Sequence, residues 1–170
     1  ANIFFGSRND SGGSGSNEDS LALELRTDGK VRLRYEANND TADNISSAAV
    51  FSDGATDWTH LAFSVKKSIA GGYNLYVNGV LEESFSTTAT TSVNWGLWTS
   101  EFNMYIGAYN SAGGTPENFL DGSIKNVAIW SRALTATEVQ NVMYKSYVNV
   151  SGRLASGLVS WWALDVDYTD

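Results

Sequence analysis

The sequence predicts an all-β fold, an antiparallel β-sandwich with one short helix near residues 136–144. Apolar and polar residues alternate with period two over most of the chain, as half-buried strands require. Segments rich in Gly, Asn and Ser separate these stretches at short intervals, which is typical of a sandwich or barrel. A chain of 170 residues is long enough for one such domain.

Two hairpins are the clearest elements. In the first, residues 21–25 and 31–36 alternate on either side of the turn segment Thr27-Asp28-Gly29-Lys30. In the second, residues 73–77 and 80–85 flank Asn78-Gly79, and this dipeptide suits the positive φ values of a type I′ turn. Further strands are expected at residues 2–6, 58–66, 103–108, 123–130 and 158–164, with a surface loop at 11–20 and a loop or weak edge strand at 87–92.

The helix is predicted from its start signal. Thr135 and Glu138 have capping-box spacing, and Leu134 and Val139 have the spacing of a hydrophobic staple. The helix should begin at about residue 136 and end at about residue 144. Its apolar side would pack on the sandwich through Val139, Val142 and Met143.

Composition excludes several classes of partner. The net charge of -8 repels phosphate backbones and anionic membrane surfaces, so we expect no nucleic-acid binding. No apolar run approaches the roughly 20 residues that span a bilayer, so we expect no membrane insertion. Cysteine is absent, which removes disulfides and thiolate chemistry. The first residues lack the charged start of a signal peptide, so we expect any export signal to lie outside this piece.

Four segments in order resemble one family. They are residues 57–65, 73–81, 104–107 and 119–134, with Leu75-Tyr76-Val77-Asn78-Gly79 and Ala128-Ile129-Trp130-Ser131-Arg132 among the most specific pieces. Together they resemble the laminin G-like branch of the concanavalin A-like lectin/glucanase superfamily. The resemblance covers roughly residues 2 to 146, and implies a jelly-roll sandwich of two curved antiparallel sheets in a domain at 1–150.

The last segment, 151–170, is interpreted as a linker and a strand. Residues 157–165 resemble the opening strand of such a module, yet here they come last, and the family's early strands are missing from the front. An aromatic strand should not stand bare in water. The stretch from Leu158 to Leu164 could close on its own sandwich or begin a next module. It could also pair with a neighbouring copy in a head-to-tail assembly, and an intermolecular role is the expectation.

A sugar site would need exposed aromatic rings beside polar side chains. The candidates are Trp95, Trp98, Tyr109 and Asn110. The alternative is that such tryptophans cap the core, as we expect of Trp58, Trp130, Trp161 and Trp162.

Calcium is the one cofactor suggested, because related modules often bind it and hard cations prefer oxygen ligands. By position in the motif, the resemblance points to Asp121, Asp165 and Asp167. Relatives often carry two acidic residues where this chain has Lys125 and Asn126. The alternative is that these acids are solvated turn residues.

The sequence lacks the carboxylate pattern that a catalytic site of this superfamily requires. Glucanases of the superfamily carry their carboxylates in a pattern like Glu-x-Asp-x-x-Glu, which does not occur here. Glu82 and Glu83 are adjacent, so they point to opposite faces of a strand. The single histidine, His60, has no Gly-x-Ser-x-Gly partner motif and is expected to be a structural strand residue.

The sequence therefore favours a non-catalytic carbohydrate-binding or adhesion module of a larger extracellular, cell-surface or virion-surface protein. Its partners would be a glycan or neighbouring protein subunits. One alternative is a structural subunit of a fibre, filament or shell assembled through strand sharing; the other is a glycoside hydrolase.

Overall fold

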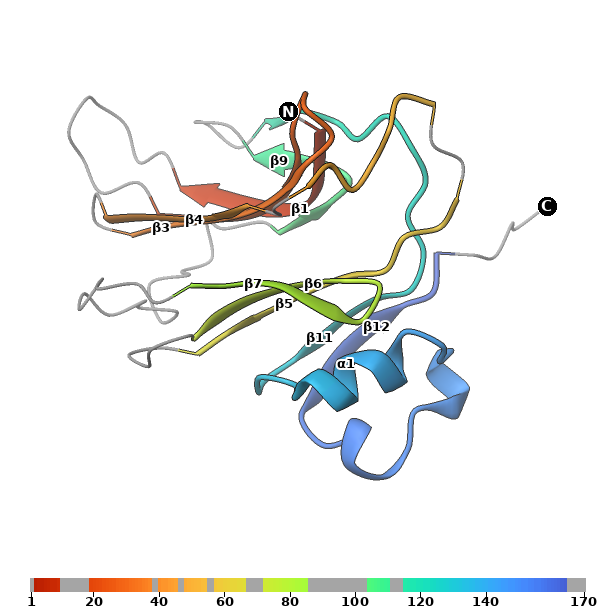
Figure 1. Cartoon of the computed structure of the whole chain (residues 1–170). Helices are drawn as coiled ribbons and strands as arrows, with labels where there is room; N and C mark the ends of the chain where they lie inside the picture. Colours follow the sequence, from red (N-terminus) through yellow and green to blue (C-terminus); the bar gives the residue numbers. More distant parts are fainter. Residues whose placement is uncertain are drawn as a thin grey trace.

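The computed structural model describes residues 2–9, 19–37, 40–45, 48–54, 57–66, 72–85, 104–110 and 115–164. Its strands lie in two facing layers (Figure 1). The first layer is one antiparallel sheet in the order β4-β3-β2-β1-β8. Its strands are β1 (Asn2–Asn9), β2 (Asp19–Leu25), β3 (Val31–Ala37), β4 (Asp40–Ile45) and β8 (Tyr105–Ile106). The short pair β9 (Tyr109–Asn110) and β10 (Pro116–Glu117) lies outside this sheet (Figure 1).

The second layer contains two separate sheets. One is β5 (Leu61–Val65), β6 (Tyr73–Val77) and β7 (Val80–Phe85); the other is β11 (Val127–Trp130) and β12 (Leu158–Trp162). Helix α1 (Ala136–Val142) and the 3₁₀ turns η2 (Tyr147–Asn149) and η3 (Gly152–Leu154) follow β11, and α1 lies on the outer side of this layer (Figure 1). The predicted antiparallel β-sandwich with one helix is confirmed.

Both predicted hairpins form. In the first, Leu23 is opposite Leu33, and Gly29 has a φ of 76°. The carbonyl oxygen of Gly29 accepts hydrogen bonds from the backbone N–H groups of Val50 and Phe51, and a Cβ on Gly29 would lie 2.1 Å from the carbonyl oxygen of Phe51. Glycine is therefore required there both by its φ and by space.

The second hairpin joins β6 and β7 through Asn78 and Gly79, whose φ values are 48° and 76°. Two positive φ values define the type I′ turn that the sequence predicts. The turn also fixes the start of β5, because the backbone N–H of Asn78 donates to the carbonyl of His60 and the backbone N–H of His60 donates to Asn78 Oδ1.

The core lies where the five-stranded sheet faces β6. Alternating residues of β2 and β3 enter it, as the period-two pattern requires. Its buried members are Leu21, Leu23, Val31, Leu33, Tyr73 and Leu75. A bulge in β1 adds aromatic surface, because the register shift between Ile3 and Phe5 lets consecutive side chains contact the same layer. Phe4 packs near Phe51 and Phe5 near Phe63.

The C-terminal strand pairs with its own chain. β12 is antiparallel to β11, with Ala128 opposite Trp161 and a register shift at Ile129 and Trp130. One edge of this strand is therefore satisfied without a neighbouring molecule. The sequence suggested that residues 158–164 pair with a neighbouring copy. Such a contact would either use the other edge of β12 or replace its pairing with β11.

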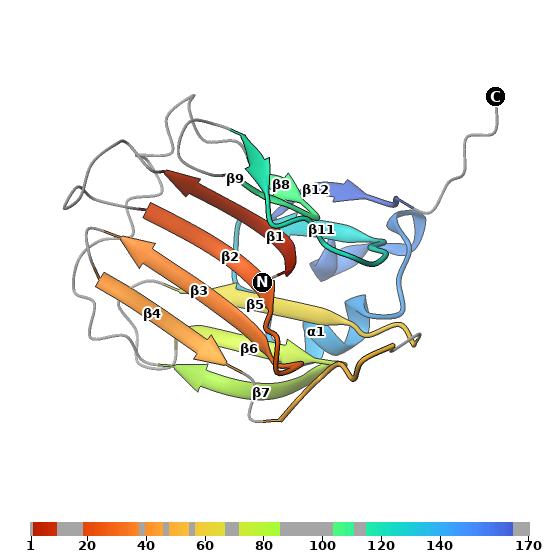
Figure 2. The same cartoon turned by 90° about the horizontal axis from the view of Figure 1, so that it is seen from above.

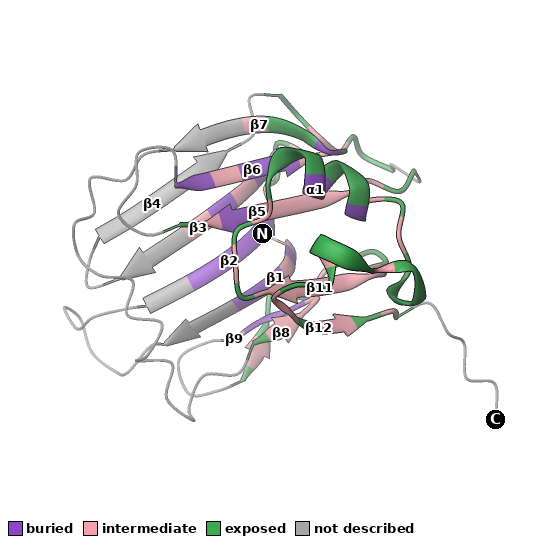
Figure 3. Ribbon diagram, turned by 90° about the horizontal axis from the view of Figure 1, so that it is seen from below, coloured by how far each residue is buried: buried purple, intermediate pink, exposed green. Residues whose placement is uncertain are grey.

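The second layer is open between β5 and β11. Among the residues that the structure describes, each of these strands has one paired neighbour, β6 and β12 respectively, and β5 and β11 share no ladder. The views from above and below show the opening between the two strands (Figures 2 and 3). The colours of Figure 3 show that the residues of β11 and most residues of β12 are half-buried or exposed, with three of five half-buried in β12, whereas β6 is mostly buried.

The helix follows its prediction. Thr135 Oγ1 accepts from the backbone N–H of Glu138, and the Glu138 carboxylate accepts from the backbone N–H of Thr135, which completes the capping box. Val139 and Val142 are buried as expected. Strands β4, β9 and β10 were not predicted. The loops expected at 11–20 and 87–92 lie outside the described residues, except that Asp19 and Ser20 begin β2.

Candidate ligand-binding cleft and its aromatic rim

The opening between β5 and β11 leads into a cleft of about 2680 Å³. Its floor is the inner face of the five-stranded sheet, including Phe4, Phe5 and Leu21, and its sides are β5 and β11. Pockets for small ligands usually measure roughly 300 to 1000 Å³, and closed interiors hold few voids larger than a water molecule. The cleft is therefore larger than a sugar or drug-sized ligand requires.

Trp58 lies at the mouth of this cleft and is exposed, which corrects the prediction that it caps the core. It retains 59% of its accessible surface. The Lys125 ammonium lies 4.2 Å from the centroid of its ring, a cation–π contact. Trp58 precedes β5 by three residues and Lys125 precedes β11 by two, so this contact joins the two starting ends of the open strands.

His60 also lines the mouth, and the hairpin turn holds it. Its backbone pairs with Asn78 as described above, while its Nδ1 is buried and has no hydrogen-bond partner among the described residues. Burial lowers the pKa of His60, because desolvation disfavours the imidazolium. The ring is neutral at pH 7 and has one nitrogen available as a hydrogen-bond acceptor or donor.

Acidic side chains flank the same mouth. Asp57 and Asp121 are exposed and line the cleft. Asp121 is in the bend before Lys125, where the resemblance points to calcium, but within the described parts of the chain no three acidic, His or Cys side chains gather as a metal site. Asp165 and Asp167 lie outside the described residues.

The predicted sugar-binding residues do not come together. Trp95 and Trp98 lie outside the described residues. Tyr109 is buried with Ile3 and Ala22. A Cβ on Gly6 would lie 3.1 Å from its ring, so the ring packs closely on that glycine. Tyr109 therefore fills the core and cannot offer its face to a sugar. Asn110 belongs to β9, opposite Pro116.

The other described tryptophans also differ in how far they are buried. Trp130 and Trp161 are half-buried, with ring centroids 6.3 Å apart in an edge-to-face arrangement, as expected of packing residues. Trp130 Nε1 donates to the carbonyl of Leu154 at 2.7 Å, whereas Trp161 Nε1 is buried without a partner among the described residues. Trp162 is 40% exposed, so it does not cap the core.

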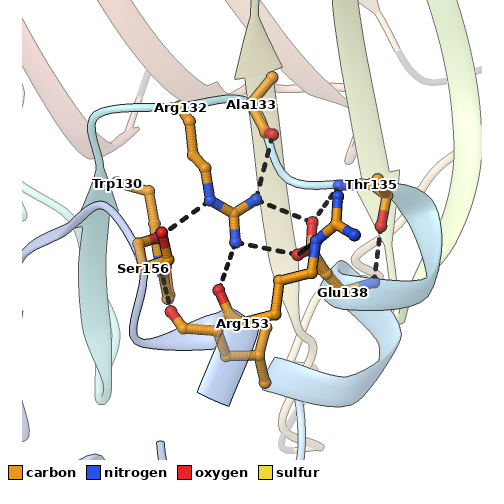
Figure 4. Close-up of polar contacts among 8 residues, drawn as sticks. Trp130, Arg132, Ala133, Thr135, Glu138, Arg153 and Ser156 are labelled. Carbon is orange, nitrogen blue, oxygen red and sulfur yellow. Dashed lines mark hydrogen bonds and ion pairs between the residues drawn. The ribbon is translucent and has the colours of Figure 1, made fainter. Parts of the chain in front are cut away.

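A polar cluster centred on Arg132, which also lines the cleft, fastens the C-terminal segment to the sandwich (Figure 4). Arg132 donates to both carboxylate oxygens of Glu138 at 2.9 Å and to the backbone carbonyls of Arg153 and Ser156. The hydrogen bonds from Arg132 and from the Thr135 N–H lower the pKa of Glu138 to about 2. Glu138 thus stays ionised, and the cluster joins β11, α1 and η3 as a structural support.

The described residues define a β-sandwich module with an opening between β5 and β11, and comparison with known families agrees with the sandwich. A laminin G family model of the concanavalin A-like lectin/glucanases superfamily matches residues 1–140, so the chain belongs to this superfamily. Comparison with curated proteins and with solved structures gives no match. The superfamily contains carbohydrate-binding and adhesion modules, and it also includes glycosidases. Within the described residues, no helix has the length and apolarity to span a membrane.

Only part of the site follows from the sequence. The missed residue is Trp58, whose exposure results from its place before β5, at the mouth of an open layer. Its neighbours Asp57 and Thr59 are polar, and that was the available signal for an exposed loop rather than a strand interior.

Proposed function

We propose that this chain is a non-catalytic carbohydrate-binding or adhesion module of a larger extracellular protein, and that Trp58 is its stacking platform. The observation that carries this proposal is the exposed Trp58 ring at the mouth of the cleft. A tryptophan face stacks on the C–H face of a pyranose, and neighbouring carboxylates and amides hold the hydroxyls. Asp57 and Asp121 supply such acceptors at the same mouth.

The absence of catalysis rests on the sequence. The paired-carboxylate strand of glucanases does not occur in this chain, and His60 lacks the Gly-x-Ser-x-Gly motif of a nucleophile partner. A cleft with an aromatic mouth and without that strand supports binding without turnover.

Calcium is kept in the proposal as a ligand-positioning ion near Asp121. A metal that binds the folded state preferentially raises its melting temperature. We expect the chain to melt at a higher temperature in calcium than in chelator, and Asp121→Ala to remove most of this difference. Identical melting of the unchanged chain in both buffers would remove calcium from the proposal.

The test of binding is a glycan array with the unchanged chain, run with calcium and with chelator. Trp58→Ala should lower the signal on bound glycans at least about tenfold, because aromatic stacking is lost. Trp162→Ala is the matched control, since it removes a tryptophan of 40% exposure on β12. No binding of any glycan by the unchanged chain, or equal binding by Trp58→Ala, would refute the proposed site.

A further inference from the structure

We infer that the cleft between β5 and β11 is an acceptor site for an extended, alternately apolar strand of a partner protein. This inference is independent of the glycan proposal, because it uses the inner walls of the cleft and backbone groups along its edges. It is carried by three observations, namely the direction of the unpaired backbone groups, the size and lining of the cleft, and the charges at its mouth.

The free edge of β5 can be assigned residue by residue. His60 accepts from the backbone N–H of Asn78, and the Lys66 N–H donates to Gly72. In an antiparallel pair, the residues that bond to the partner alternate with residues that face the other way. The backbone groups of Leu61, Phe63 and Val65 therefore point away from β6 and toward the opening.

The free edge of β11 follows by the same argument. The Asn126 N–H donates to the carbonyl of Ala163, and the register then pairs Ala128 with Trp161 as the next bonded position. The backbone groups of Val127 and Ile129 consequently point away from β12. They face the same cleft as the edge of β5, because both strands line it.

The contact between Trp58 and Lys125 shows that β5 and β11 start at the same end of the cleft. The two strands therefore run in the same direction, as Figure 2 also shows. One extended segment between them could be antiparallel to both, which gives the favoured ladder on each side. An extended polypeptide backbone offers N–H donors and C=O acceptors on both edges at the spacing of these two strands.

The cleft has the size and the lining for such a segment. Its volume of about 2680 Å³ exceeds what a small ligand fills, and Phe5, Leu61 and Ile129 present apolar surface to it. Two buried polar atoms on its walls, His60 Nδ1 and Trp161 Nε1, lack partners among the described residues. A strand with apolar side chains inward would cover the walls and bring backbone groups near these atoms.

The charges at the mouth favour a partner protein over a second copy of this chain as the occupant of the cleft. Asp57 and Asp121 flank the mouth, where Lys125 is engaged with Trp58. A segment antiparallel to β5 would end at this mouth, so it should carry Lys or Arg at its C-terminal end. Two copies of a chain with net charge -8 repel each other, and each described strand already pairs within the chain.

The experiment uses the synthetic peptide Ser-Thr-Val-Ser-Ile-Thr-Val-Ser-Val-Lys-Lys and residue-resolved amide exchange of the whole chain by NMR. Saturating peptide should slow exchange at least about tenfold at Leu61, Phe63, Val65, Val127 and Ile129. Ala62 and Ser64 should change little, because they already bond to β6. The same peptide with alternate amides N-methylated should not protect these positions.

A matched pair of variants tests the site from the protein side. Val127→Asp places a carboxylate in the cleft and should weaken peptide binding at least about tenfold. Val148→Asp makes the same change at a position that is 84% exposed and outside the cleft, and should leave binding unchanged. If Val127→Asp fails to fold, the exchange pattern of the unchanged chain decides alone.

Three results would overturn the inference. Equal slowing at Ala62 and Leu61 would mean general stabilisation. An unchanged exchange pattern would mean that the peptide does not enter the cleft. A concentration-dependent dimer in sedimentation, with the five positions protected without peptide, would make a second copy the occupant.

Discussion

The β6 side of the sandwich and the β11 side differ in how fully they are enclosed. On the first, Leu75 of β6 is buried against the five-stranded sheet, where it packs with Leu23 and Leu33. On the second, all four residues of β11 are half-buried, and the cleft separates them from β5. All four residues of β11 are apolar and none of them is fully buried, so the difference arises from which neighbours are present and not from composition.

This difference has consequences for energy and for function. Where the two layers meet completely, buried side chains stabilise the fold through close packing. Where one layer is open, apolar side chains and backbone edges remain available to a partner, and Trp58 is exposed at the mouth. The closed side should therefore dominate stability, and the open side should dominate recognition.

The largest expected effect is on the closed side. Leu75→Ala should lower the free energy of unfolding by about 3 to 5 kcal/mol, because it leaves a cavity in a closed core. Ile129→Ala should cost less than about 1.5 kcal/mol, since its side chain already borders the cleft. Urea titration measures both, and equal losses would contradict the contrast between the two sides.

The second effect concerns the polar cluster that supports the C-terminal segment. Glu138→Gln should cost about 2 to 3 kcal/mol, because the charge-assisted bonds to Arg132 and the backbone cap weaken. Arg153→Gln is the control and should cost less than about 1 kcal/mol, since its side chain is 80% exposed. Denaturant titration measures both variants. A larger loss of unfolding free energy in Arg153→Gln than in Glu138→Gln would refute this account.

The same carboxylate gives an acid dependence. The folded-state pKa of Glu138 is about 2, below its ordinary value of 4.5, so its contribution is present above pH 4.5 and is lost as the pH falls toward 2. The free energy of unfolding should therefore fall over this interval, and less steeply in Glu138→Gln. Parallel pH profiles for the two proteins would contradict the assignment.

A smaller effect is expected at His60. Because burial lowers its pKa in the folded state, the unfolded chain takes up the proton first, and stability is lost as the pH falls below 6.5. His60→Gln should flatten the stability profile between about pH 7 and pH 5. A profile as steep as that of the unchanged chain would assign the slope to other groups.

The smallest effect on stability is expected at Trp58, although its effect on binding should be large. With 59% of its surface exposed, Trp58→Ala should cost less than about 1 kcal/mol, far below the roughly 3 to 5 kcal/mol of a core tryptophan. Thermal melting of the variant measures this. A loss in the core range would place the ring inside the fold and contradict the proposed platform.

The local elements were predictable because each depends on neighbouring residues. The Asn78-Gly79 turn, the Thr135–Glu138 cap and the hairpin at Gly29 all formed as predicted. Strand β4 (Asp40–Ile45) was missed because its polar sequence lacks the apolar alternation, and it pairs with β3 through the backbone.

The site could not be predicted in the same way. The exposure of Trp58 and the burial of Tyr109 depend on the gap beside β5 and on the close approach of Gly6, which join distant parts of the chain. The pairing of β12 with β11 is a further contact between separated segments. The period-two alternation of apolar and polar residues indicates which residues share a face of a strand. It does not indicate whether a layer of the sandwich is complete.

The open layer is tested most directly by amide exchange in the chain without added ligand. Leu61, Phe63 and Val65 should exchange close to the rate of unprotected amides, while Ala62 and Ser64 between them are slowed at least about a hundredfold by their bonds to β6. This odd–even contrast along one strand is the predicted result. Equal protection at all five positions would mean that the outer edge of β5 is covered, and it would contradict the account.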